Sequence, residues 1–431
     1  MKSNSKKGLG IAAGIVLLAV AGCSSSAKTS TSAAATGNKT LNVWWYQKGD
    51  ALGATWTDAL TAFEKANPGV KVNFQLKTWA QLQNAGNAML TSSSAPDVTE
   101  WNKGNATAGT ASQAGLLTDL TSYAKKYKWD KVLTPSVKAY GQYTNGLMGN
   151  GKLYGVPSYG EYVSWFYNKA MFTKYGVTVP TTFAQLESAL ATFKTAGVPA
   201  IALAGKDYPM VHIAYGLVAS QANLQWVKDY QSFAHPVNFN GPEWSFAANT
   251  IAKWNQAGYF EPNATGIDAN TAVADFEKGT YPLLFGGTWL DQDVATKATF
   301  PWGKFAMPGK LSVGSAGNLF VIPTKSKQKD LAAEFINMII STKYQNELAV
   351  KGGLPIAAAP GVLASLKDPT SKLTNSLFNS ILKTKGLAMY PDWPVNGQYN
   401  ELLADGTQLL VDNDVASYIK KTADFYNSNK P

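Results

Sequence analysis

The chain of 431 residues is long enough for two domains, and an apolar content of 45% is typical of a globular protein. Every one of its 38 basic residues is lysine, so the arginine fork that recognises carboxylates, phosphates and guanine is absent, and anionic ligands and nucleic acid are disfavoured. One cysteine and two histidines exclude an intrachain disulfide and leave too few soft ligands for a structural zinc site.

The lysines are scattered along the chain, so the net charge of +10 is expected to reflect a solvated surface. Aromatic residues make up 12% of the chain. Most of them are expected to fill hydrophobic cores, but their flat apolar faces can also stack on sugar rings. A neutral ligand is therefore favoured over an anionic one.

Residues 1–22 have the pattern of a secretory signal peptide. Lysines precede a short apolar run at 11–20, which is too short to span a membrane comfortably. The segment ends Val20-Ala21-Gly22-Cys23, which resembles the lipobox of bacterial lipoproteins. The resemblance implies that Cys23 is acylated and becomes the mature N-terminus. The alternative is an ordinary signal peptide with a chance cysteine.

Residues 24–38 form a polar, low-complexity stretch of Ser, Thr, Ala, Lys, Gly and Asn. Such a composition buries no core, so we expect a tether between the acylated cysteine and a folded body.

The first predicted elements after the tether alternate between strand and helix. Residues 39–45 form a β-rich run, residues 55–67 have the apolar period of an amphipathic helix, and residues 70–76 alternate strictly. A helix at 81–90 and a strand that opens at Pro96-Asp97-Val98 follow. This order predicts a parallel sheet with crossover helices.

Candidate ligand contacts lie where two of these strands end. Trp45, Tyr46 and Gln47 end the first strand, and Trp101 ends the strand that opens at Pro96. Ligands of open α/β sheets bind beyond the carboxyl ends of the strands. For Trp101, the alternative is a packing role over the local core.

Residues 151–172 contain the predicted joint of the molecule. Val156-Pro157 requires an extended backbone, and residues 162–167 are apolar on both faces, as in a buried central strand. Between them lie Tyr159, Gly160 and Glu161. An aromatic ring, a flexible residue and a carboxylate in sequence can form a hinge that also presents groups to a ligand. The alternative is a structural strand with a solvated carboxylate.

Later elements continue the α/β pattern. Helices are predicted at 183–193 (capped by threonine), 215–226, 271–278, 329–350 and 415–426, and strands at 198–203 and 281–289. His212 and His235 are interpreted as structural histidines, with ligand contact as the alternative.

The joint carries a family resemblance. Gly151, Lys152, Tyr154 and Pro157, followed by Tyr167-Asn168-Lys169, are similar to the hinge segment of solute-binding proteins of bacterial ABC importers. The similarity is to the sugar-binding group that includes maltose-binding protein. Residues 62–72 and the strand at 281–289 resemble the same family.

The resemblance implies an α/β, two-lobed periplasmic-binding-protein fold. Each lobe is then a mostly parallel sheet flanked by helices, and the chain crosses between the lobes at hinges. We expect residues 39–158 with 304–357 in the first lobe, and 159–303 with 358–431 in the second. The second hinge is expected within residues 302–315.

The implied function is that of the substrate-binding component of an ABC importer. Such a protein captures a neutral oligosaccharide by hinge closure and delivers it to the transmembrane subunits of the permease. We expect a monomer on the cell surface, held by a lipid anchor on the outer face of the cytoplasmic membrane, as in Gram-positive bacteria. No cofactor, metal, nucleic-acid partner or catalytic step is expected.

In this family, a glutamate placed as Glu161 often touches the sugar, and a tryptophan placed as Trp289 stacks on it. Asn318 corresponds to the edge of the ligand cleft, and Trp393 faces the cleft if the likeness holds. The predicted ligand contacts are Trp45, Tyr46, Gln47, Trp101, Tyr159, Glu161, Trp289, Asp291, Asn318 and Trp393.

Two other functions are weighed. A secreted glycoside hydrolase needs two carboxylates about 5–10 Å apart across one bond, and Glu161, Asp291 or Asp392 can be assigned to these roles. No motif places two of them together. A carbohydrate-binding surface adhesin without a transporter is the other alternative, and the two-lobe pattern argues against it.

Overall fold

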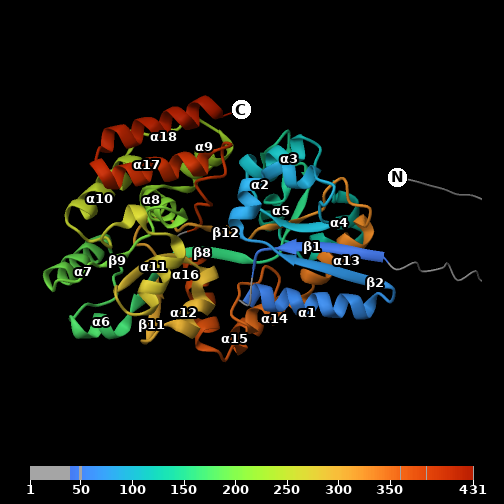
Figure 1. Cartoon of the computed structure of the whole chain (residues 1–431), viewed down its shortest axis with the longest axis horizontal. Helices are drawn as coiled ribbons and strands as arrows, with labels where there is room; N and C mark the ends of the chain where they lie inside the picture. The colour runs from blue at the N-terminus through green and yellow to red at the C-terminus, as the bar shows by residue number, and fades with distance from the viewer. Residues whose placement is uncertain (1–38, 48–50, 360, 385, 431) are drawn as a thin grey trace, which may run out of the picture. The chain divides into compact units, whose positions relative to one another are not determined.

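The computed structural model describes residues 39–47, 51–359, 361–384 and 386–430. The predicted signal peptide, Cys23 and the tether lie outside the described residues. Figure 1 shows two β-sheets, each accompanied by its own helices. Together they form the two lobes of the α/β fold expected from the sequence.

The first sheet has the strand order β2-β1-β3-β13-β7. Its strands are β1 (Lys39–Trp45), β2 (Val70–Leu76), β3 (Val98–Trp101), β7 (Gly155–Pro157) and β13 (Leu319–Val321). β1 pairs in parallel with β2 and β3, whereas β13 is antiparallel to β3 and β7. The helix α1 (Ala51–Ala66) makes the predicted crossover between β1 and β2 and buries Trp56 and Phe63.

The second sheet has the strand order β11-β8-β10-β9. Its strands are β8 (Gly160–Asn168), β9 (Ile201–Ala202), β10 (Leu283–Gly287) and β11 (Trp302–Phe305), and β12 (Gly314–Ala316) also pairs with the start of β8. β8 is the long buried strand predicted at the joint. The strands β4 (Gln142–Thr144), β5 (Leu147–Met148) and β6 (Lys152–Leu153) form a third, separate sheet.

The chain crosses between the two sheets twice, each time from one strand to the next strand in sequence. β7 in the first sheet continues through Tyr159 into β8 in the second, and β12 continues through Gly317 and Asn318 into β13. The backbone amide of Gly317 donates to the carbonyl of Tyr159 at 2.5 Å. A Cβ on Gly317 would lie 2.2 Å from the Tyr159 ring, so only glycine fits here.

The second crossing differs from the predicted one. The expected boundary between residues 303 and 304 cuts β11, which pairs with β8 throughout and belongs to the second sheet. β12 also pairs with β8, so the chain returns to the first sheet only at Gly317 and Asn318.

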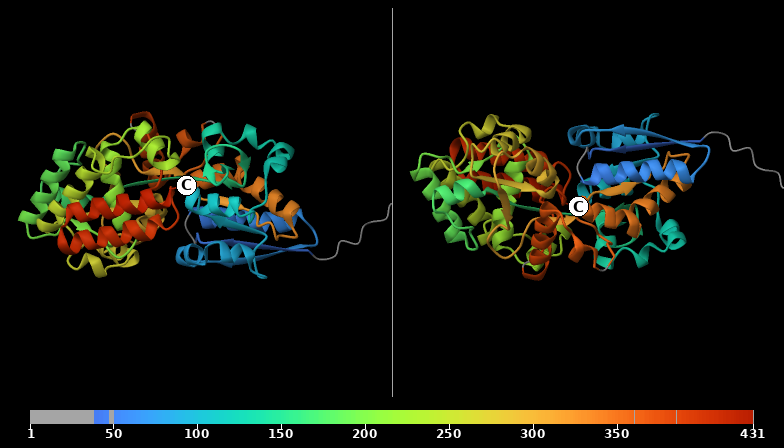
Figure 2. Two further views of the ribbon diagram at one scale, coloured as in Figure 1. Left: turned by 90° about the horizontal axis from the view of Figure 1, so that it is seen from above. Right: turned by 90° about the horizontal axis from the view of Figure 1, so that it is seen from below.

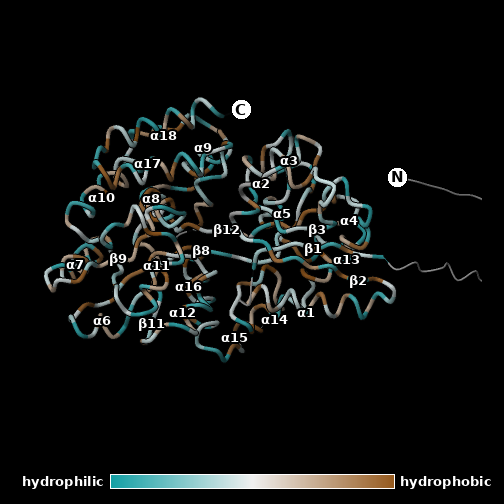
Figure 3. The backbone as a smooth tube through the Cα atoms, in the orientation of Figure 1, coloured by the Kyte–Doolittle hydropathy of each residue, from teal (hydrophilic) through white to brown (hydrophobic). Residues whose placement is uncertain are grey.

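The helices surround these sheets. Most bury one face, but α8 is buried on all sides from Pro209 to Ser220, and α5 has no buried residue. In the first lobe they are α2 (Trp79–Thr91), α3 (Thr110–Gln113), α4 (Thr121–Tyr127), α5 (Pro135–Ala139), α13 (Lys329–Ile339) and α14 (Thr342–Val350). Those of the second lobe are α6 (Lys169–Lys174), α7 (Phe183–Thr195), α8 (Tyr208–Gln221), α9 (Leu224–Ser232), α10 (Pro242–Gln256), α11 (Ala269–Glu277), α12 (Asp291–Lys297), α16 (Pro369–Thr384), α17 (Gln398–Asp412) and α18 (Val415–Asn429). A short helix, α15 (Val362–Ser365), lies between α14 and α16. Figure 3 shows polar and apolar stretches alternating along peripheral helices such as α18.

Two predicted helices are interrupted. Residues 329–350 form α13 and α14, with Ser341 in extended backbone between them (ψ 151°). The helix predicted at 215–226 is divided between α8 and α9, because the Asn223 side chain accepts a hydrogen bond from the Trp226 amide and starts a new helix. Both breaks occur at residue types that favour helix caps over helix interiors.

Each lobe has a separate hydrophobic core. The first is built on Trp45, Trp56 and Phe320, and the second on Trp165, Tyr215 and Trp244. None of the helices in the described ranges is both long enough and apolar enough to cross a bilayer.

Candidate functional site

The carboxylate of Glu100 lies where both crossings meet the ends of β1 and β3. It is fully buried. Among the described residues, it accepts hydrogen bonds from the Tyr46 amide (3.2 Å), Gln47 Nε2 (3.3 Å), the Tyr159 hydroxyl (3.4 Å) and Asn318 Nδ2 (3.4 Å). The Tyr46 hydroxyl also accepts a hydrogen bond from Asn318 Nδ2. The strand ends of the first lobe and the second crossing thus share one polar network, at the edge where α/β sheets bind ligands.

Lys103 extends this network into the second lobe. Its Nζ lies 2.9 Å from Glu161 Oε1 on β8 and donates to Asn318 Oδ1 at 3.2 Å. The Ser315 hydroxyl donates to the same Glu161 oxygen at 3.2 Å. The Lys103 side chain is only 1% exposed, so its charge depends on these partners for compensation.

A row of rings lies beside Lys103. Trp289, His212, Tyr390 and Trp393 follow one another with centroid separations of 5.6, 5.5 and 5.5 Å. Lys103 Nζ is 4.9 Å from the centroid of the Trp393 ring, within the range of a cation–π contact. Trp289 comes from the turn after β10, His212 from α8, and the other two from the loop before α17.

Some buried polar atoms in this row have no hydrogen-bond partner within the described part of the chain. They are the Tyr390 hydroxyl and His212 Nδ1, together with Oε1 of the neighbouring Gln231. The Gln231 amide nitrogen is already used, since it donates to the Tyr390 carbonyl at 2.7 Å. Unpaired buried groups are energetically unfavourable, so these atoms are suited to hydrogen-bonding a polar ligand.

Burial sets the protonation of the site. It lowers the pKa of His212 to about 3, so the imidazole is neutral at physiological pH. Burial also raises the pKa of Asp392 to about 6, although Lys103 and a hydrogen bond from Asn102 favour the ionised form. The same effect holds the pKa of the Tyr390 and Tyr159 hydroxyls well above the usual value, so both stay protonated.

Seven of the ten predicted ligand contacts lie in these two groups. Tyr46, Gln47, Tyr159, Glu161 and Asn318 belong to the polar network, and Trp289 and Trp393 to the row of rings.

The other three have packing roles. Trp45 is 1% exposed and packs against Trp56 in the first core, and Trp101 is 4% exposed among apolar neighbours that include Leu319. Successive strand residues point to opposite faces, so their neighbours Tyr46 and Glu100 point to the polar network instead. Asp291 forms a buried ion pair with Lys304 at 2.7 Å and accepts a hydrogen bond from the Thr374 hydroxyl.

Sequence reasoning missed Glu100, Lys103 and Tyr390 and interpreted His212 as structural. Glu100 directly precedes Trp101, which was among the predicted contacts, and Lys103 follows Trp101 by two residues. Tyr390 begins the rigid loop that contains Trp393. His235, by contrast, is exposed and pairs with Asp229 at 2.8 Å.

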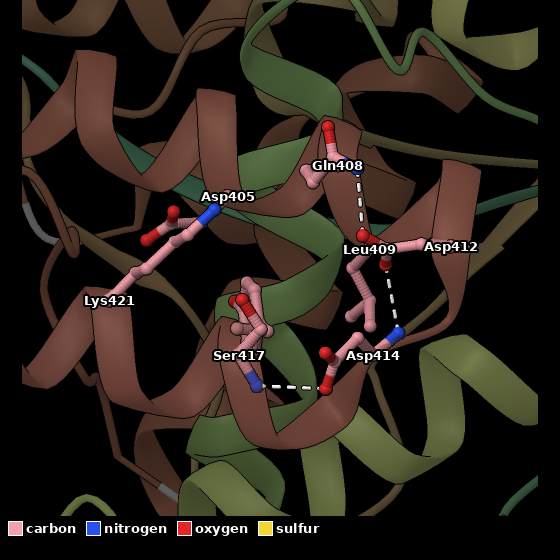
Figure 4. A pocket seen from close by; sticks show the side chains of 8 residues that line it. Asp405, Gln408, Leu409, Asp412, Asp414, Ser417 and Lys421 are labelled. Carbon is pink, nitrogen blue, oxygen red and sulfur yellow. Dashed lines mark hydrogen bonds between the residues drawn. The ribbon is translucent and has the colours of Figure 1, made fainter.

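Two surface hollows lie elsewhere and contain none of the predicted contacts. Figure 4 shows one between α17 and α18, where the polar side chains bond to one another or to the local backbone: Gln408 donates to Asp412 at 2.7 Å, and Asp414 accepts from the Ser417 amide at 2.9 Å. The other is an open groove of about 510 Å³ between α7 and α10. Among the described residues, no cluster of three or more His, Cys, Asp or Glu side chains could hold a metal.

Two lobes joined by paired crossing strands, with polar and aromatic groups gathered at the joint, define a ligand-binding protein of the hinged type. The family of bacterial extracellular solute-binding proteins matches residues 48–346. The chain belongs to this family.

Individual relatives are distant. The chain is 26% identical to a probable sugar-binding periplasmic protein of Mesorhizobium japonicum over 56% of this chain and 58% of that protein. It is 25% identical to a maltooligosaccharide ABC transporter solute-binding lipoprotein of Streptococcus pneumoniae, over 55% of this chain and 56% of that protein. These matches span a little over half of each relative.

The fold extends over almost the whole chain. The GacH receptor of Streptomyces glaucescens, solved unliganded and with acarbose, superimposes with a TM-score of 0.73 at 21% identity, covering 90% of this chain and 98% of that one. At 21% sequence identity, this structural similarity establishes the fold of the chain.

Proposed function

We propose that the protein is the substrate-binding component of an ABC importer that captures a neutral oligosaccharide between its lobes and passes it to the membrane permease. Membership of the solute-binding family supports the transport role. The pneumococcal relative supports the importer type and the class of ligand.

The observation that carries this proposal is the position of the unpaired groups. The half-buried Trp289 ring offers a face to the apolar side of a sugar, and the Tyr390 hydroxyl and His212 Nδ1 of the same row offer buried polar atoms to sugar hydroxyls. A sugar ring has apolar faces and polar edges, so a site that binds it needs both a stacking surface and hydrogen-bonding groups. The absence of arginine fits an uncharged ligand.

The proposed mechanism is closure about the two crossings. Lys103 and Glu161 approach each other from different lobes, so their contact depends on the angle between the lobes. A ligand that touches both lobes favours the closed form through the contacts that it makes only there. On the sheet pairing, the first lobe contains residues 39–158 and, after the second crossing, 317–357.

The proposed location is the outer face of the cytoplasmic membrane, with acylated Cys23 as the anchor and residues 24–38 as the tether. The family is extracellular, and the pneumococcal relative is a lipoprotein. We further propose that the protein acts as a monomer without a cofactor and performs no catalysis.

A thermal-shift panel tests the proposal. The chain from residue 39 onward is mixed with xylo-, gluco-, malto- and galacto-oligosaccharides. A true ligand at about a hundred times its Kd stabilises the folded state by about 2.7 kcal/mol. One series is expected to raise the Tm, and mass spectrometry is expected to recover the sugar intact. Cleavage would favour the hydrolase alternative, and no shift with any series would contradict sugar capture.

A further inference from the structure

We propose that one lysine-rich face of the first lobe docks on the anionic phospholipid headgroups of the membrane to which the chain is tethered. This inference rests on the proposed lipid anchor and adds an orientation for the folded body. The face comprises Lys39, Lys65, Lys71, Lys125, Lys126, Lys128, Lys325, Lys327 and Lys329. All of these side chains are exposed except that of Lys329, which is half-buried.

Three contacts bring the elements of this face together around the start of α13. The Tyr123 hydroxyl on α4 donates to Asp330 at 2.7 Å. Asn67, just after α1, donates to Glu334 at 3.0 Å. The amide of Lys39 at the start of β1 donates to the Gly69 carbonyl at 2.9 Å, next to the start of β2. The views agree that the starts of β1 and β2 and the C-terminal end of α1 lie near α13 (Figures 1 and 2).

The positive charge of this face is largely uncompensated. None of its lysines takes part in an ion pair within the described ranges. Four nearby carboxylates, those of Glu64, Asp97, Asp330 and Glu334, accept hydrogen bonds from neutral donors. Their charges offset at most four of the nine lysines. Asp119 and Asp130 are paired with other lysines, Lys152 and Lys138.

The position of the tether indicates that the membrane is the partner of the lysine-rich face. Lys39, the first residue of β1, directly follows residues 24–38, and a segment of that length reaches at most about 50 Å even when it is fully extended. The face is therefore held close to the bilayer, where attraction to anionic headgroups acts within a Debye length of about 8–10 Å. A hydrated ammonium group also needs no fixed geometry to attract lipid phosphates.

Docking on this face leaves the ligand site accessible. β1 runs from Lys39 in the face to Trp45, directly before Tyr46 and Gln47 in the polar network, so face and site lie at opposite ends of the strand, about 20 Å apart. With the face on the membrane, the site points away from the bilayer, so this orientation serves ligand capture, and the body must leave it to deliver the ligand to the permease.

Vesicle sedimentation tests the inference with the chain from residue 24, which lacks the acylated cysteine. Equimolar phosphatidylglycerol–phosphatidylcholine vesicles are compared with pure phosphatidylcholine. Each lysine near an anionic surface contributes about fivefold to binding, so Lys325→Gln, Lys327→Gln and Lys329→Gln together are expected to lower partitioning by at least about tenfold. The matched control replaces Lys169, Lys174 and Lys194, exposed lysines of the second lobe, and is expected to change it by less than about twofold.

Three results would overturn the inference: no binding of the unsubstituted chain to anionic vesicles, equal losses in the two triple variants, or equally strong binding to soluble polyglutamate, which would indicate an acidic protein or polymer as the partner. The sugar-induced thermal shift is measured on the same proteins and is expected to be unchanged by either triple substitution. If no sugar binds but the vesicle result stands, the proposed importer function fails while the docking face remains.

Discussion

The ammonium group of Lys103 lies 2.9 Å from a carboxylate oxygen of Glu161, and the two side chains are 1% and 9% exposed. Lys103 follows β3 of the first sheet, and Glu161 is the second residue of β8 in the second. This buried pair joins the two lobes at the point where the chain crosses between them.

Removing the cation from this pair is expected to destabilise the protein. Lys103→Met leaves the Glu161 carboxylate buried without its counter-charge, and such a change lowers the free energy of unfolding by about 3–5 kcal/mol. Urea denaturation measures the loss. The double variant Lys103→Met, Glu161→Gln is expected to recover most of it, because no uncompensated charge remains.

An exposed ion pair provides the control. Lys253 and Glu187 lie 2.7 Å apart, but the lysine side chain is 60% exposed. Lys253→Met is expected to lower the free energy of unfolding by less than about 1 kcal/mol, because water already screens the charges. Equal losses at both lysines would contradict a special role for burial at the joint.

Gly104 is predicted to be essential for the approach of the Trp393 loop. Its φ is +95°, and a Cβ there would lie 2.5 Å from Trp393 Cβ. Gly104→Ala is expected to raise the Kd for the sugar by about tenfold or more, because the loop must move away by an amount that disrupts ligand contacts. Calorimetric titration measures the change.

Gly115→Ala separates backbone strain from this steric effect. Gly115 also has a positive φ (+69°), but a Cβ there meets nothing within 4 Å. Gly115→Ala is expected to destabilise the fold by about 1 kcal/mol through backbone strain and to leave the Kd unchanged, whereas Gly104→Ala is expected to destabilise the fold by more because of the added clash. A similar loss of affinity in both variants would refute the steric argument.

Trp289→Ala is predicted to weaken sugar binding by about tenfold, through loss of the stacking surface. Trp289 also donates a hydrogen bond to the Tyr208 hydroxyl at 3.2 Å. Trp289→Phe keeps a ring, and Tyr208→Phe removes only the hydrogen bond, so both are expected to bind within about threefold of the unsubstituted protein. An affinity of Trp289→Ala within about twofold of normal would remove Trp289 from the site.

His212 is predicted to make the protein sensitive to acid. Burial lowers its pKa to about 3 in the folded state, against about 6.5 when unfolded, so between these values only the unfolded chain takes up the proton. Its contribution to stability is complete above about pH 6.5 and falls by up to about 1.4 kcal/mol for each pH unit below.

The difference between the unsubstituted protein and His212→Gln isolates this effect. The rings of Tyr208, Trp289 and Tyr390 face His212. Asp392 and Glu261, whose pKa values burial raises to about 6 and about 7, act in the opposite direction and are present in both proteins. Denaturation between about pH 7 and pH 4 is expected to show a shallower loss in the variant. If the free energy of unfolding falls equally with decreasing pH in both proteins, the buried imidazole is not the cause of the acid sensitivity.

The first strands and the first crossing were predictable because their signals are local, whereas the second crossing lies beyond the predicted range. β1 and β2 have the bounds expected from their β-rich sequence and alternation, and the Pro157-to-Asn168 stretch forms the predicted joint. The breaks between α8 and α9 and between α13 and α14 were missed, since continuous apolar spacing concealed Asn223 and Ser341, which start new helices.

The site was only partly predictable, because its network joins residues that are remote in the chain. Glu100 meets Asn318 across 218 positions, and Lys103 meets Asn318 across 215, so no local pattern indicates either contact. Trp45 and Trp101 point into cores, and their neighbours Tyr46 and Glu100 belong to the polar network at the same strand ends. Alternation predicts that adjacent residues point to opposite faces, and only packing decides which face each one takes.

Calorimetric titration with the oligosaccharide series that raises the Tm tests sugar capture most directly. The account predicts saturable binding of one sugar per chain, recovery of the sugar intact, and a Kd raised by about tenfold in Trp289→Ala. The absence of saturable binding for every neutral series, or tighter binding of an anionic ligand, would contradict the central claim.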